Sequence, residues 1–252
     1  MTRGFAMSMA ALLAAGAAPA HAVEGERDLA EPVARREVRA EITPYLWIVG
    51  MDADVTVGGT TVSPSIGFSD LMDAADFGGS VFGQFEYQRL LAYLQLDYMK
   101  LSTGNLDHPP AAGKLDSEAL LTAFGVGYQF PGLWGGSNLG AMIGLRVSYL
   151  QNDLTLYGMG SASGSKTLVD PLLILTPSIP ITRWLRLNPT FSIGAFGDSD
   201  WTYELQPHLQ FQLTDHVAAR LGYRRLYMDY QGDKGEISGA MHGFLVGLGL
   251  TL

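Results

Sequence analysis

The chain has little of what several protein classes need. Its 252 residues include no cysteine, so the fold depends on no disulfide. Only 16 lysines and arginines oppose 25 acidic residues, a net charge of −9 that argues against a nucleic-acid-binding protein, because such proteins need a basic patch. After the first 22 residues no apolar run approaches the roughly 18–20 residues of a transmembrane helix. A membrane protein of this sequence would therefore have to be a β-barrel.

The amino terminus has the features of a secretory signal peptide. Arg3 precedes a mostly apolar run over residues 5–18, and Pro19 and the small residues Ala20 and Ala22 follow. This order predicts a signal peptide over 1–22, against the alternative of a buried amino-terminal helix. Cleavage would remove Arg3 as the only charged residue and bring the net charge to −10. The charged segment 23–37 is predicted to be a disordered periplasmic lead, and 38–252 the folded domain.

The last fifteen residues set the pattern for the rest. Alternate positions carry bulky apolar side chains, and the positions between them are mostly small. The bulky row is Phe244, Val246, Leu248, Leu250 and Leu252, and the lean row is Gly243, Leu245, Gly247, Gly249 and Thr251. A period of two indicates a strand, and a glycine-rich face is too thin to be a polar coat. The pattern favours a strand with its apolar face toward lipid and its lean face toward a narrow lumen.

Similar alternation recurs about ten times from residue 38 onward, most regularly over Trp201–Leu213. The segments are joined by tight turns alternating with mostly longer loops. The fold class predicted is all-β, an antiparallel up-and-down transmembrane β-barrel of about ten strands with both termini periplasmic. Eight strands remain possible if segments merge, and a soluble lipocalin-like barrel is the alternative if the faces are reversed.

Four interruptions of the alternation are interpreted as loops or irregular strands. Residues 58–77 are predicted to form a long loop with one short amphipathic helix, because Phe68, Leu71, Met72 and Ala75 have helical spacing. A second loop is expected near 105–114 and a glycine- and serine-rich loop over 158–166. In Thr167–Ile181, three prolines remove ladder donors, so a bulge or an irregular strand is expected there.

Charged residues at inward positions offer the most chemistry. Unpaired charges inside a narrow barrel cost several kcal/mol, so we expect a network of ion pairs that plugs the lumen, with a selectivity filter as the alternative. The residues assigned to this network are Glu86, Asp97, Arg146, Asp170, Glu204, Arg220 and Arg224.

Catalytic and metal sites are not predicted. Ser238 and His242 share a strand face but lie about 13 Å apart at strand rise, too far for a dyad. His108 beside Asp107 and the inward-facing His208 are interpreted as a turn residue and a satisfied lumen histidine. The four histidines that follow residue 22 lie in different segments without ligand spacing, so no metal site is expected. Four aromatic residues are predicted to form two interfacial girdles: Tyr98, Trp134, Trp184 and Trp201.

Three segments carry a resemblance to a known family. With its opening Thr43-Pro44-Tyr45-Leu46-Trp47, the later Gly222-Tyr223-Arg224 and the glycine-rich closing strand, the chain resembles the small outer-membrane β-barrel proteins of Gram-negative bacteria, the OmpX/OmpW-like group. The resemblance implies an outer-membrane location, no cofactor, and insertion by the barrel-assembly machinery, although this chain ends in Leu252 where family members usually end in an aromatic residue.

The function expected is that of a non-enzymatic envelope or surface protein with a polar, mostly plugged lumen. A narrow passive channel for small solutes is the first alternative, and a membrane-embedded lipid- or peptide-modifying enzyme is the second. The partners expected are outer-membrane lipids, both lipopolysaccharide and phospholipid, for a monomer that binds no nucleic acid.

Overall fold

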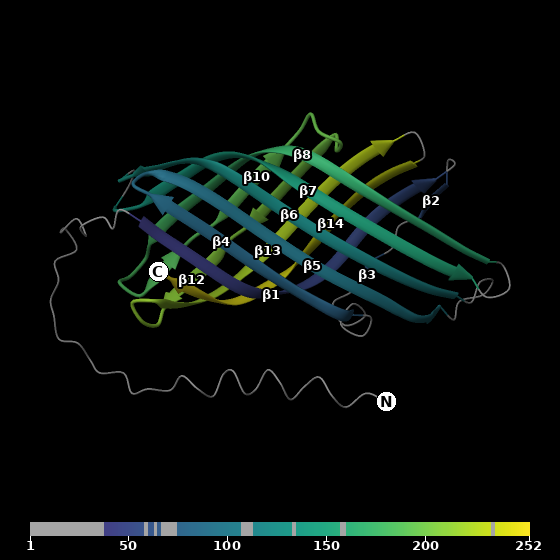
Figure 1. Ribbon diagram of the computed structural model, residues 1–252, viewed down its shortest axis with the longest axis horizontal. Helices are drawn as coiled ribbons and strands as arrows, with labels where there is room; N and C mark the ends of the chain where they lie inside the picture. Colours follow the sequence, from purple (N-terminus) through teal and green to yellow (C-terminus); the bar gives the residue numbers. More distant parts are fainter. Residues whose placement is uncertain are drawn as a thin grey trace, which may run out of the picture. The chain divides into compact units, whose positions relative to one another are not determined.

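The computed structural model describes residues 38–57, 60–62, 65–66, 75–106, 113–132, 135–156, 160–232 and 235–252 (Figure 1). The predicted signal peptide, the predicted lead over 23–37 and the segment 67–74, where most of the predicted short helix falls, lie outside these residues. Throughout the described residues the regular structure is β-strand. No helix in this part of the chain is long and apolar enough to cross a membrane.

The strands vary from two to 21 residues in length. In chain order they are β1 (Val38–Val57), β2 (Thr60–Val62), β3 (Ser65–Ile66), β4 (Ala75–Tyr87), β5 (Leu90–Leu106), β6 (Gly113–Pro131), β7 (Asn138–Leu156), β8 (Gly160–Pro180), β9 (Leu185–Leu187), β10 (Thr190–Gly194), β11 (Trp201–Gln206), β12 (His208–Gln212), β13 (Val217–Gly232) and β14 (Gly235–Thr251).

These strands close into one antiparallel barrel. Each long strand pairs with its neighbours in the chain, and β1 pairs both with β4 and with β14, from Glu41 opposite Thr251 to Thr56 opposite Glu236. The short strands β9 and β10 together occupy one strand position in the barrel wall, and β11 and β12 occupy the next. We call each such position a stave. The strands β2 and β3 pair only with β1. Within the described ranges the wall therefore has ten staves, which confirms the predicted fold and excludes the eight-strand alternative.

A row of three prolines explains why two of the staves are split. Leu175 is opposite Phe191 and Ile179 is opposite Leu187, a register that places Pro177 opposite Pro189. The pairing of β9 with β12 and of β10 with β11 places Pro189 opposite Pro207 in the same way. Proline has no N–H to donate, so the ladder is interrupted between β9 and β10 and between β11 and β12.

The bulge expected within Thr167–Ile181 is absent from the pairing of β8 with β7, whose register is continuous from Leu156 opposite Gly160 to Asn138 opposite Ser178. The irregularity lies instead in the neighbouring stave, where the ladder is interrupted between β9 and β10. The predicted loop over 158–166 is also wrong in its larger part, because β8 begins at Gly160. Main-chain pairing with β7 continues there, and it does not require apolar side chains.

The two faces of the wall differ as the alternation predicts. Every stave contributes at least one exposed bulky apolar side chain to the outside of the barrel. Examples from the ten staves are Ile42, Phe85, Leu94, Val126, Ile143, Leu173, Ile193, Leu205, Leu221 and Phe244. On β14 Phe244, Val246, Leu248 and Leu250 are exposed, whereas Leu245 faces inward and is buried. A continuous apolar belt of this kind is typical of a surface that contacts lipid.

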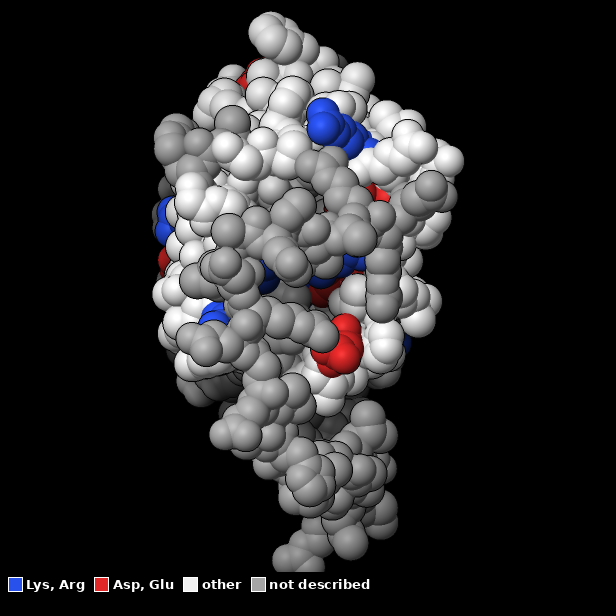
Figure 2. Space-filling view, turned by 90° about the vertical axis from the view of Figure 1, so that its left-hand side faces the viewer, with Lys and Arg blue, Asp and Glu red and all other residues white. Residues whose placement is uncertain are grey.

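The two ends of the barrel also differ. The turns at 88–89, 181–184 and 213–216 lie at one end, here called the turn end, together with Val38 and Leu252; the opposite end is called the loop end. Figure 2 looks onto the turn end and shows charged atoms around a hollow near the middle of the face. The interior is only partly polar, because a buried apolar cluster that includes Phe82, Met142 and Ile174 fills part of it.

Candidate functional site

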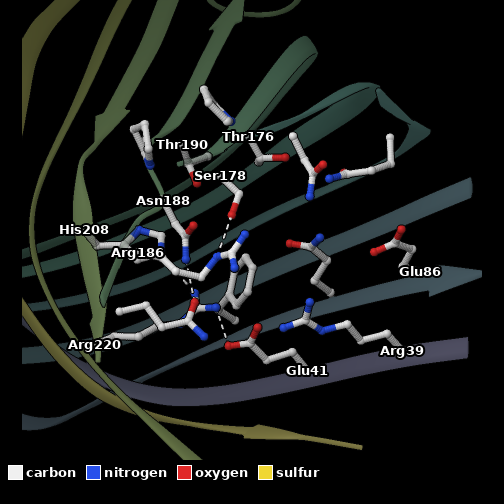
Figure 3. Close-up of a pocket in the computed structure, with 17 residues that line it drawn as sticks. Arg39, Glu41, Glu86, Thr176, Ser178, Arg186, Asn188, Thr190, His208 and Arg220 are labelled. Carbon is white, nitrogen blue, oxygen red and sulfur yellow. Dashed lines mark hydrogen bonds and ion pairs between the residues drawn. The ribbon is translucent and has the colours of Figure 1, made fainter. Parts of the chain in front are cut away.

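A cavity of about 90 Å³ opens inside the barrel near the turn end. Its walls come from strand positions within a few residues of the turns, where alternate side chains point inward (Figure 3). The charged side chains that line it are Arg39 and Glu41 on β1, Glu86 on β4, Arg186 on β9 and Arg220 on β13. Three arginines against two glutamates give the cavity a net charge of +1, in a protein whose net charge is −9.

Only part of this charge is neutralised by close pairs. Arg220 Nη2 donates to Glu41 Oε1, and Arg220 Nη1 lies 3.2 Å from His208 Nε2. Arg186 donates from Nε to the Ser178 hydroxyl at 3.3 Å. In the described part of the chain no carboxylate forms an ion pair with Arg39 or Arg186, and the charge of Arg39 repels that of Arg186. The cavity thus has guanidinium groups with unused donors.

Buried polar atoms without hydrogen-bond partners are concentrated in the same place. The described residues contain seven such side-chain atoms, and six belong to residues that line the cavity. They are Gln129 Oε1, Thr176 Oγ1, Asn188 Oδ1, His208 Nδ1, Gln210 Nε2 and Arg220 Nε. Since buried polar groups in proteins normally have a partner, a cavity that collects unsatisfied ones is built to hold water or a polar ligand.

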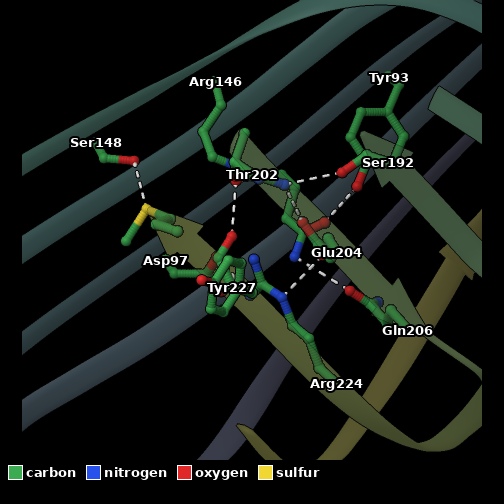
Figure 4. A network of polar contacts seen from close by, with 12 residues as sticks. Tyr93, Asp97, Arg146, Ser148, Ser192, Thr202, Glu204, Gln206, Arg224 and Tyr227 are labelled. Carbon is green, nitrogen blue, oxygen red and sulfur yellow. Dashed lines mark hydrogen bonds and ion pairs between the residues drawn. The ribbon is translucent and has the colours of Figure 1, made fainter. Parts of the chain in front are cut away.

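Further along the lumen, a second group of polar side chains crosses the barrel (Figure 4). We call it the middle layer: Tyr45, Asp97, Arg146, Glu204 and Arg224, with Gln95, Ser192 and Thr202 attached. Asp97 lies on β5 and Glu204 on β11, which are five staves apart in either direction around a ring of ten. Contacts that connect these two strands therefore cross the lumen.

The two arginines of the middle layer bridge its carboxylates. Arg146 Nη2 lies 2.5 Å from Glu204 Oε2, and Arg146 also donates to Thr202 Oγ1 at 2.8 Å and Ser192 Oγ at 2.9 Å. Arg224 donates from Nε to Glu204 Oε1 at 2.8 Å and from Nη1 to Asp97 Oδ2 at 2.7 Å. The chain Arg146–Glu204–Arg224–Asp97 thus carries two positive and two negative charges and is neutral as a unit.

Aromatic and amide groups complete the layer. The Tyr45 hydroxyl donates to Asp97 Oδ1 at 2.6 Å, and the Arg224 guanidinium lies 4.1 Å from the ring centroid of Trp47. Gln95 fits the network with its amide oxygen 2.9 Å from Arg224 Nη1. The four charged residues are only 1–2 % exposed. Charges so far from water are stable only because each has an opposite charge and hydrogen bonds at short distance.

The seven residues assigned to the lumen network from sequence are distributed over both regions and the loop end. Asp97, Arg146, Glu204 and Arg224 meet in the middle layer, whereas Arg220 and Glu86 line the cavity. Asp170 is fully buried and accepts from the backbone N–H of Ser199 at 2.8 Å and from its hydroxyl at 2.9 Å. It thereby ties the β10–β11 connection to β8.

Three important residues were not found from sequence. Glu41 pairs with Arg220, Tyr45 bonds to Asp97, and the Tyr93 hydroxyl accepts from the Gln95 amide nitrogen. A signal was present, since Glu41, Thr43 and Tyr45 alternate with the exposed Ile42, Pro44 and Leu46. Arg39 lies two residues before Glu41 on the same strand, so its side chain is on the same inward face.

The residues weighed for catalysis do not come together. Ser238 shares a hydrogen bond of 2.8 Å with the Tyr227 hydroxyl, and His242 Nε2 contacts Asp52 Oδ2 at 3.0 Å, both on the outer face of the wall. Asp107, His108 and Trp134 lie outside the described residues. Among the described residues no three His, Cys, Asp or Glu side chains are grouped so that they could hold a metal ion. The exposed Trp184 lies at the turn end, and Trp201 begins β11 at the loop end.

Comparisons with known proteins agree with the fold. No family model matches the chain. No curated protein matches it either. Among solved structures, the outer-membrane protease OmpT from Escherichia coli is similar over 85 % of this chain and 96 % of its own, with a TM-score of 0.58 and 12 % identity. The chain therefore has the fold of a small outer-membrane β-barrel.

Two further structures align over most of the chain with lower scores. The attachment invasion locus protein Ail of Yersinia pestis covers 86 % of this chain and 100 % of its own at 12 % identity, with a TM-score of 0.37. The translocator domain of the autotransporter NalP from Neisseria meningitidis covers 87 % and 90 % at 9 % identity, with a TM-score of 0.41.

Proposed function

We propose that the protein is an integral outer-membrane β-barrel whose lumen is closed, and that it acts in the envelope without catalysing a reaction. The observation that carries this proposal is the middle layer, whose ion pairs join strands on opposite sides of the ring. The apolar belt, to which every stave contributes, supports a location in the membrane. Strands of 17 to 21 residues exceed the roughly 9–11 residues that span a bilayer, so several would project beyond it.

The proposed orientation places the turn end in the periplasm and the loop end outside the cell. Lipopolysaccharide and phospholipid would then cover the two halves of the belt, and the barrel-assembly machinery would insert the chain. We further propose a monomer, because ten staves close the ring without a second copy. Cleavage of residues 1–22 belongs to this proposal, and the mass of the protein extracted from outer membranes would show whether the chain begins at Val23.

The decisive experiment is planar-bilayer recording of the purified protein, after a gel with and without boiling has shown the mobility shift of a closed barrel. We expect the shift and no steady conductance. A stable open current would contradict the closed lumen and favour the narrow passive channel. If the protein instead remained in the soluble fraction and showed no shift, the proposal of a membrane barrel would be wrong.

An enzymatic role is the second candidate, because OmpT, which is similar in fold, is a protease. A fold shared at 12 % identity does not transfer an activity, since function depends on the site and not on the barrel. The exposed pair of His242 and Asp52 is the one described feature that favours this candidate. Peptide and phospholipid hydrolysis by wild type and His242→Ala tests it. We expect no turnover by either protein above the rate of buffer alone.

A further inference from the structure

The cavity at the turn end goes beyond the proposed role of a closed barrel, because its side chains are arranged differently from a plug. Its floor is made of the buried His208 and Gln210 and of Arg220, whose side chain is 10 % exposed, and its rim includes the exposed Arg39. The Arg220 guanidinium packs 4.8 Å from the ring centroid of Phe82, which also lines the cavity, and beyond these residues the middle layer closes the lumen. The cavity is therefore a blind pocket with its mouth at the turn end.

We propose that this pocket binds a small oxyanion, a phosphate or carboxylate group, through Arg39, Arg186 and Gln210. Three arginine side chains converge on it in Figure 3, and guanidinium groups recognise oxyanions by paired N–H donors. One of these arginines, Arg220, is engaged by Glu41. Arg186 uses only Nε within the described residues, so its terminal nitrogens are available to a ligand.

The unsatisfied atoms specify where the oxyanion oxygens would lie. Gln210 Nε2 and Arg220 Nε are buried donors without acceptors, and both belong to the pocket floor. The Gln210 amide is held in place because its oxygen accepts from Asn188 Nδ2 at 2.5 Å. An oxygen bound between Gln210 and Arg186 would satisfy a donor that is otherwise buried without a partner, which is a large part of what makes such an interaction favourable.

Size and charge limit the ligand. A water molecule needs about 10–15 Å³ of such volume, so a cavity of about 90 Å³ has room for several waters or one small polyatomic anion, and not for a larger solute. The net charge of +1 from the lining residues complements a single negative charge. Bound water alone would also occupy the space, but it would leave the excess guanidinium charge without a counterion.

The test is isothermal titration of the folded, purified protein in detergent with inorganic phosphate and, in a separate arm, acetate. We expect saturable binding of at least one anion in the millimolar range or below, and the tighter arm identifies the group. Arg186→Gln should weaken that binding about tenfold, the effect of one charge-assisted hydrogen bond. Arg183→Gln is the matched control, because Arg183 is exposed in the adjacent turn and does not line the pocket; its affinity should stay within twofold.

Two results would overturn the proposal. One is no saturable binding of either anion, which would leave water as the occupant. The other is equal weakening by Arg186→Gln and Arg183→Gln, which would indicate general surface charge. If Arg186→Gln fails to show the mobility shift of a folded barrel, Arg39→Gln at the exposed rim replaces it with the same expected direction. Because the titration is made in detergent, its result is independent of whether the lumen conducts.

Discussion

The middle layer and the pocket at the turn end use the same kinds of side chain inside the same barrel, but they differ in how completely those side chains are paired. In the middle layer two arginines meet two carboxylates, and hydroxyl, amide and aromatic groups contact the remaining surfaces. In the pocket three arginines meet two carboxylates, and six buried polar atoms of the described residues have no partner.

This difference separates a structural role from a binding role. A neutral, fully hydrogen-bonded cluster has nothing left to offer a ligand, and it is stable only while all its members are present. A cluster with excess charge and unused donors is less favourable by itself and gains free energy when a complementary ligand arrives. The contrast implies that substitutions in the middle layer should change stability, whereas substitutions in the pocket should mainly change binding.

The largest expected effect comes from breaking the middle layer at its centre. Arg224→Met would leave Asp97 and Glu204 buried with a missing counter-charge, at a cost of about 3–5 kcal/mol in the free energy of unfolding. Denaturant titration, followed by the mobility of the unboiled protein on a gel, measures this loss. Arg225→Met is the control, because this next side chain along β13 faces outward and donates from Nε to the Tyr203 hydroxyl at 3.3 Å. Equal losses in the two variants would mean that the middle layer has no special stabilising role.

A smaller effect is expected from the wall beside the pocket. A Cβ at Gly222 would lie 2.6 Å from both His208 Cβ and the Pro207 carbonyl oxygen, and that backbone belongs to the row of prolines. Gly222→Ala should therefore destabilise the barrel by about 1–3 kcal/mol through overpacking. Gly79→Ala is the matched control, since a Cβ there meets nothing within 4 Å. If Gly222→Ala were as stable as Gly79→Ala, the backbone beside the pocket would be able to shift and accommodate the added methyl group.

Next in size is a change in binding. Glu41→Gln removes the carboxylate that engages Arg220, so the lining charge of the pocket rises from +1 to +2. Phosphate affinity should increase about fivefold, or about 1 kcal/mol, while the protein without phosphate becomes less stable because Arg220 loses its partner. Asp215→Asn removes the same charge from an exposed turn at the same end and should leave the affinity unchanged. Titration calorimetry distinguishes them, and weaker phosphate binding by Glu41→Gln would contradict the assigned role of Glu41.

How far the sequence predicts this molecule depends on whether a feature is local. Alternation is local, and it was sufficient to predict the strands, the apolar belt and the inward direction of Asp97 and Arg224. The pairing of side chains across the lumen is not local, because it depends on the stagger between strands such as β5 and β13. Arg220 could therefore be placed inside from its strand, but its partner Glu41, 179 residues away, could not be identified.

The same reasoning explains the wrong predictions. Residues 160–166 lack apolar alternation and were expected to be a loop, yet backbone pairing with β7 needs no such side chains. Of the row, only Pro177 was expected to disturb its strand, and Pro207 fell within the segment of most regular alternation. Only the register shows that Pro177, Pro189 and Pro207 are opposite one another, so that a single interruption of the ladder accommodates all three.

The smallest expected effect comes from an ion pair that lies outside the lumen. His242 and Asp52 also form a pair at 3.0 Å, but their side chains are 32 % and 60 % exposed on the outer face. An exposed pair of this kind contributes less than about 1 kcal/mol, since solvent screens it and both side chains lose freedom when they pair. His242→Ala should therefore shift the unfolding midpoint far less than Arg224→Met in the same titration. A comparable shift would mean that neighbouring aromatic rings, such as Tyr223 stacked on His242, shield the outer pair as the lumen shields the middle layer.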